Sequence, residues 1–138
     1  MDRTRLNPGR RAGTDNFVGM LALAAALVMP AGPAAAQGCD ARWPQLQFAR
    51  DDMQRAGNEG DLASAQDYAD RARRASDHLA ALSTRCDCAP AAARFEETAA
   101  TLRRAQDVDS RKDLRDVISG AKSLFQAAQA QLQECRKR

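Results

Sequence analysis

Cys86-Asp87-Cys88, near the middle of the exported part of the chain, decides the predicted fold, because the other two cysteines lie equally far on either side of it. Cys39 lies 47 residues before Cys86, and Cys135 lies 47 residues after Cys88. In an oxidising compartment, four cysteines in a small chain favour two disulfides over metal ligation. The spacing therefore predicts two arms of equal length, each a helical hairpin closed by one disulfide.

Two pairings of these cysteines are compatible with the spacing. The preferred one joins Cys39 to Cys86 and Cys88 to Cys135. Each hairpin can then close before the other folds, at a lower loop-closure cost. The crossed pairing, Cys39 with Cys88 and Cys86 with Cys135, is the alternative, because the two arrangements differ by only two residues at a shared end. A bond between Cys86 and Cys88 would form a ring too tight for the usual Cα separation of about 4.4–6.8 Å.

Residues 1–36 are typical of a secretory signal peptide. Four arginines precede the apolar run 17–29, and Ala34-Ala35-Ala36 supplies the small side chains that a signal peptidase needs. The apolar run is too short to cross a hydrocarbon core, which needs about 20 residues. We expect cleavage after Ala36 and a periplasmic or secreted protein with no stable membrane insertion of the mature chain. An uncleaved anchor, a twin-arginine signal at Arg10-Arg11 and lipidation of Cys39 are the alternatives.

The mature chain is small and nearly neutral. Removing 36 of the 138 residues leaves 102, enough for a single helical domain, 37–138, with hairpins 39–86 and 88–135. Lysine plus arginine falls from 21 to 17 and aspartate plus glutamate from 18 to 16, so the net charge falls from +3 to +1. Nucleic-acid binding needs many unopposed basic residues, so this balance argues against a nucleic-acid partner.

Apolar and small residues recur at spacings of three and four, which predicts helices. The first helix opens at Pro44 and ends near Gly57, and the second is capped by Asp61 and continues to Cys86. The first has the stripe Leu46, Ala49, Met53 and Ala56, and the second has Leu62, Ala65, Ala69, Ala72, Ser76, Leu79, Ser83 and Cys86. Because the second stripe consists mostly of small residues, its partner helix can approach closely.

The second arm repeats this design. The third helix opens at Pro90, and Ser110 with Asp113 forms a predicted capping box for the fourth. The third helix has the stripe Phe95, Thr98, Leu102 and Ala105, and the fourth has Leu114, Val117, Ile118, Ala121, Leu124, Phe125, Ala128 and Leu132. A single bent helix from Pro90 to Cys135 is the alternative. Strand patterns are absent, so the sequence predicts an all-α, elongated four-helix bundle with all four cysteines at one end.

One stretch of the second helix resembles a known repeat family. It is similar to the second helix of a tetratricopeptide repeat, over the pattern Gly60-Asp61-Leu62-x-x-Ala65-x-x-Tyr68-x-x-x-Ala72. The resemblance covers about 13 residues. It implies close packing of two helices and carries no family assignment.

The sequence predicts no catalytic residues, no metal site and no cofactor. Cys86 and Cys88 beside Arg85 could act as a redox dithiol, which makes an envelope thiol-disulfide factor the alternative function. Disulfide formation would remove both thiols, and it would also remove them as metal ligands beside His78. We interpret the remaining acidic clusters as solvated helix caps; they are Asp51-Asp52 and the group Asp107, Asp109, Asp113 and Asp116.

Five residues form the predicted interaction surface: Trp43, Phe48, Arg71, Arg73 and Arg74. Trp43 and Phe48 lie near the start of the first helix, where we expect them to cover the cysteine end. Two ion pairs at helical i,i+4 spacing, Asp67 with Arg71 and Asp70 with Arg74, are expected on the outer surface.

These observations predict that the protein acts by binding another protein or itself. We expect a non-enzymatic protein-interaction or structural module of the bacterial envelope, with an unknown protein partner or self-association. The weaker alternative is a binder of anionic envelope polymers through Arg71, Arg73, Arg74 and the basic tail 136–138.

Overall fold

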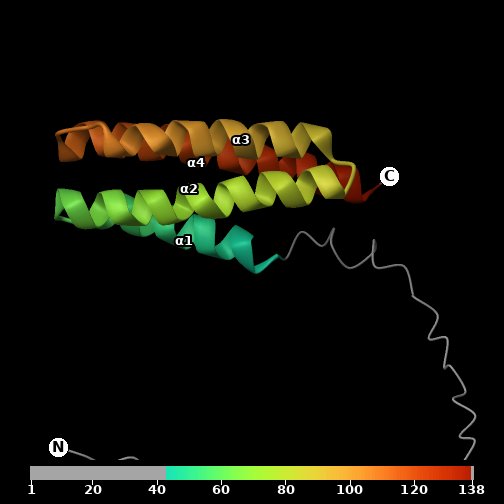
Figure 1. The fold of residues 1–138 in the computed structure, drawn as a ribbon, viewed down its shortest axis with the longest axis horizontal. Coiled ribbons are helices and arrows are strands. Elements are labelled where there is room, and N and C mark those ends of the chain that lie inside the picture. Colours follow the sequence, from blue (N-terminus) through green and yellow to red (C-terminus); the bar gives the residue numbers. More distant parts are fainter. Residues whose placement is uncertain (1–42, 138) are drawn as a thin grey trace, which may run out of the picture. The chain divides into compact units, whose positions relative to one another are not determined.

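The computed structural model describes residues 43–137, which form four helices lying side by side (Figure 1). The helices are α1 (Pro44–Asn58), α2 (Leu62–Arg85), α3 (Ala89–Arg103) and α4 (Arg111–Arg136). Each packs against the next in sequence, and α1 also packs against α4. The all-α four-helix bundle is confirmed for the described residues. The predicted signal peptide and Cys39 lie outside them.

The two hairpins share their capping chemistry at the start of the return helix. The Asp61 carboxylate accepts the Ser64 backbone N–H at 2.8 Å, and this hydrogen bond lowers the pKa of Asp61. At α4, the Ser110 hydroxyl accepts the Asp113 N–H at 3.1 Å and donates to the Asp113 carboxylate at 2.7 Å. Both predicted caps are therefore confirmed. The helices that they begin start 49 residues apart, at Leu62 and Arg111, and this equals the separation between Cys39 and Cys88, where the two arms begin.

A clear break separates α3 from α4, so the alternative of one bent helix from Pro90 to Cys135 is wrong. A short 3-10 turn, Arg104–Gln106, follows α3, and the chain then reverses. The Gln66 side chain of α2 holds this link by donating to the carbonyls of Ala105 at 3.0 Å and Val108 at 3.1 Å. Residues 107–110 therefore form a turn, although they include neither glycine nor proline.

Cys86-Asp87-Cys88 forms a compact turn between the hairpins. The Cys88 N–H donates to the Ser83 carbonyl at 2.9 Å, and the Asp87 N–H donates to the Thr84 carbonyl at 3.1 Å. This is the Schellman pattern of a helix end, which needs a left-handed residue at the position of Asp87. Asp87 has φ 54°, a conformation that aspartate adopts more readily than most residues. The turn therefore ends α2 and leads directly into α3.

The core is built from the predicted stripes. Alanines with no exposed surface line α1 and α2, which lets these helices approach closely, while the larger side chains come mainly from α3 and α4. The Phe95 and Phe125 rings meet edge to face with centroids 5.5 Å apart. The fully or nearly fully buried large side chains are Met53, Leu79, Phe95, Leu102, Leu114, Ile118 and Phe125. Val117 and Leu124, expected in the stripe, are only half-buried.

Candidate interaction surface

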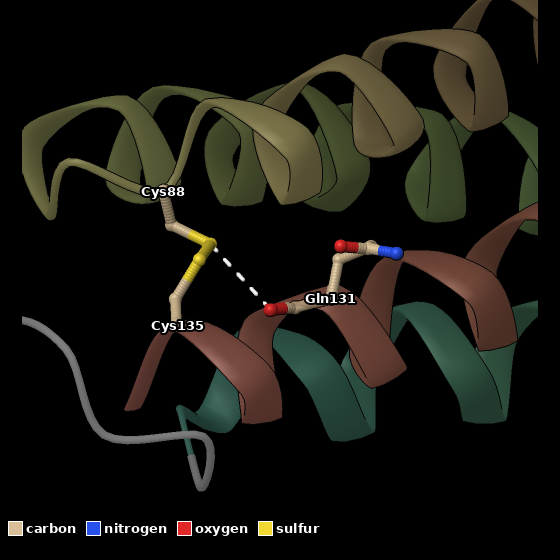
Figure 2. The surroundings of a disulfide bond; sticks show 3 residues. All are labelled: Cys88, Gln131 and Cys135. Atoms are coloured by element: carbon tan, nitrogen blue, oxygen red, sulfur yellow. Dashed lines mark hydrogen bonds between the residues drawn. A yellow bond between two sulfur atoms is a disulfide. The ribbon is translucent and has the colours of Figure 1, made fainter. Parts of the chain in front are cut away.

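A disulfide joins Cys88, just before α3, to Cys135, near the end of α4 (Figure 2). The two Cα atoms are 5.8 Å apart, within the usual range for a disulfide. Cys88 has no exposed surface, and its sulfur lies 3.7 Å from the carbonyl oxygen of Gln131, which is one turn before Cys135 on α4. The predicted closure of the second hairpin is confirmed, and the crossed pairing that joins Cys86 to Cys135 is wrong.

Cys86 is also disulfide-bonded, so the described residues contain no free thiol. The predicted partner, Cys39, lies outside these residues, and the Cys39–Cys86 bond stays a prediction. A cavity of about 40 Å³ beside Cys86, Cys88 and Cys135 has room for about one water molecule. All three described cysteines at this end of the bundle are therefore in disulfides, with little empty space between them.

The α1–α2 face, which we define by Phe48, Asp52, Arg55, Tyr68 and Arg71, combines an exposed aromatic ring with paired charges. The guanidinium carbons of Arg55 and Arg71 lie 5.8 and 5.2 Å from the centroid of the Tyr68 ring. Such cation-π contacts hold the two arginine side chains in place. Arg71 also forms an ion pair with Asp52 at 3.1 Å, which links α2 to α1.

Two predictions about this face are wrong. The Asp67–Arg71 pair does not form, because Arg71 extends across the hairpin to Asp52 instead. Asp52 is therefore not a solvated cap: it is only 7 % exposed and lies against the neighbouring helix. A carboxylate at such a position needs an ionic partner, which Arg71 supplies.

Phe48 is 61 % exposed and lies one turn before Asp52 on α1. It is the only large hydrophobic side chain that is exposed among the described residues. The expectation that Phe48 covers the cysteine end is therefore wrong, whereas Trp43 is buried and belongs to the core. Residues one turn apart share a helix face, so Phe48 continues the α1–α2 face toward the start of α1.

Arg73 and Arg74 form a separate ionic cluster on α2. The Arg73 guanidinium donates to Asp70 at 2.8 Å and to Asp77 at 2.9 Å, and these carboxylates raise the pKa of Arg73. Arg74 also pairs with Asp70, which confirms the predicted Asp70–Arg74 pair. Arg71, Arg73 and Arg74 therefore each have a carboxylate partner.

Sequence reasoning missed Asp52, Arg55 and Tyr68 as members of one surface. The position of the turn between α1 and α2 could have predicted these contacts. Asp52 with Arg71, and Arg55 with Tyr68, are pairs centred on the same point of the chain, between Asp61 and Leu62. In an antiparallel hairpin, residues equally far from the turn face one another, so the turn position predicts both contacts once its register is known.

The described residues define a class of protein: an all-α bundle of two helical hairpins, with a disulfide closing the second and an aromatic and ionic surface on the first. No family model, curated protein or solved structure matches the chain. Within residues 43–137, no group of histidine, cysteine or acidic side chains could hold a metal ion. No helix in the same range is long and apolar enough to cross a membrane.

Proposed function

We propose that this chain is an exported, non-enzymatic protein-interaction module of the bacterial envelope, and that the α1–α2 face is its contact surface. The observation that carries the proposal is the exposed Phe48 ring, which shares one face of α1 with Asp52 and Arg55, the residues that contact Arg71 and Tyr68 of α2. Aromatic and arginine side chains are the residues that most often dominate binding energy at protein interfaces. The signal-peptide pattern of residues 1–36 supports export.

The contacts within the α1–α2 face support this role. Its side chains project from two packed helices, and the Asp52–Arg71 ion pair and the Tyr68 contacts orient Arg55 and Arg71 before any partner arrives. Binding then loses less side-chain entropy than it would on a mobile loop. A partner can therefore use Phe48 as an apolar anchor and the arginines as oriented donors.

The alternatives have less support. A thiol-disulfide factor needs an accessible Cys86–Cys88 dithiol, and Cys88 is instead fully buried and bonded to Cys135. A binder of anionic polymers needs many unopposed positive charges, and the three arginines expected to supply them are each paired with a carboxylate, as is Lys137 of the basic tail. Both observations favour recognition of a protein over either alternative.

Replacing Phe48 by alanine is the direct test. Immobilised wild-type protein is expected to retain a specific partner from a periplasmic extract, or to self-associate, and F48A is expected to weaken that binding at least tenfold, as anchor residues do. Quantitative mass spectrometry of the retained proteins and light scattering measure the two cases. The control is Q47A, which removes an exposed neighbour on α1.

Two outcomes would contradict the proposal. The first is equal retention and equal self-association by the wild type, F48A and Q47A. The second is turnover of a disulfide substrate that depends on Cys88. Because Phe48 is mostly exposed, F48A should keep its fold, and circular dichroism of the variant checks this.

A further inference from the structure

A second recognition feature lies on the other flank of α1, in a groove between α1 and α4. The groove has a volume of about 300 Å³ and is lined by Arg50, Met53 and Gln54 of α1 and by Lys122, Phe125, Gln126 and Gln129 of α4. Met53 and Phe125 belong to the core and form an apolar floor, while the glutamines form a polar rim. An apolar floor with a few polar groups around it is typical of a binding site.

Two cations lie at opposite ends of this groove. The Lys122 ammonium extends from α4 to the end of α1, where it would lie 3.7 Å from a Cβ atom on Gly57. Arg50 lies two helical turns earlier on α1, about 10 Å away along the helix axis. Within residues 43–137, neither side chain forms an ion pair, and the groove lining contains no acidic residue. The groove is therefore an unopposed positive site.

A larger groove beside α1 and Tyr68 of α2 has a different character. Its volume is about 520 Å³, and its lining includes Asp51 and Glu59 as well as Arg55, whose guanidinium lies over Tyr68. Its acidic groups oppose its single cation. Charge complementarity therefore selects the α1–α4 groove as the site for an anionic ligand.

We infer that the α1–α4 groove docks an acidic, amphipathic segment of a partner protein. An apolar side chain of the segment covers the Met53–Phe125 floor, and one carboxylate at each end pairs with Arg50 and with Lys122. The amides of Gln54, Gln126 and Gln129 can donate to and accept from the segment's polar groups. The inference rests on the proposed function, because it specifies the chemistry of a partner for the same protein.

A labelled peptide tests this site on the mature protein with its disulfides intact. The probe is a fluorescein-labelled helical peptide with two glutamates about seven residues apart, the separation that spans two turns, and leucines midway between them. Fluorescence anisotropy is expected to show binding that weakens about tenfold in the double variant R50Q/K122Q, which loses both charge pairs. The control R103Q/R115Q removes two exposed charges elsewhere on α3 and α4 and is expected to change binding less than twofold.

A second peptide separates the contribution of the apolar floor to binding from that of the charges. It keeps the glutamates and replaces the leucines by serine, and it is expected to bind at least tenfold more weakly than the first because the serines bury much less apolar surface of their own against Met53 and Phe125. No binding by the wild type, equal losses in the two double variants, or equal binding of the two peptides would each overturn the inference. Loss of partner capture in F48A would still support the proposed function, so the two failures are distinguishable.

Discussion

Replacing Cys88 and Cys135 together by alanine is expected to lower the free energy of unfolding by about 4 kcal/mol. The bond links residues 47 positions apart, and a loop of that size gives about this value in the chain-entropy model. For a domain of this length the loss corresponds to a fall in Tm of roughly 15–30 °C. Thermal and urea unfolding, followed by circular dichroism under non-reducing conditions, measure the change.

Complete reduction of the wild type is the control for this prediction. Reduction also breaks the disulfide that contains Cys86, so reduced wild type is expected to be less stable than the C88A/C135A variant. A loss below about 1 kcal/mol in the double variant would mean that helix packing alone holds the second hairpin closed, contrary to the stabilising role given to the bond.

Truncating Phe95 to alanine is expected to cost about 3–5 kcal/mol, because the ring is fully buried on α3 and its removal leaves a cavity in the bundle. The same substitution at Phe48 is the matched control. Since Phe48 is mostly exposed, F48A is expected to change the free energy of unfolding by no more than about 0.5 kcal/mol. Urea unfolding of both variants gives the comparison directly.

The contact between Phe95 and Phe125 adds a second measurement. A double-mutant cycle with F95A and F125A is expected to give a coupling of about 0.5–1.5 kcal/mol, the range for edge-to-face aromatic pairs. Similar losses in F95A and F48A, or additive losses in the cycle, would contradict the packing of α3 against α4 around these rings.

The sequence predicted the fold well because its signals are local. Asp61 and Ser110 mark the starts of α2 and α4 by the capping chemistry that the structure confirms. The 3-4 spacing of small residues identified the buried faces because a helix places such residues on one side. The Cys-x-Cys stretch placed the link between the hairpins, and one of its two predicted bonds, Cys88–Cys135, is confirmed.

The interaction surface was harder to predict because it depends on contacts between helices. Arg71 has an acidic residue at i−4, and local spacing alone favours that pair. Its pairing with Asp52 depends on the register of α1 against α2, which helical periodicity does not determine. The same limitation applies to Arg111, which donates to the carbonyls of Ala56 at 3.3 Å and Gly57 at 3.4 Å and so joins the start of α4 to the end of α1. Both arginines therefore bind groups on a neighbouring helix instead of their own.

The central structural claim is that each hairpin is closed on itself by its own disulfide. Non-reducing peptide mapping tests it most directly, because a protease that cleaves before aspartate can cut between Cys86 and Asp87 and so separate the two central cysteines. Mass spectrometry of the digest is expected to find one linked pair containing Cys88 with Cys135 and another containing Cys39 with Cys86. A linked pair containing Cys39 and Cys88 would contradict the claim, because the two arms would then be joined to each other.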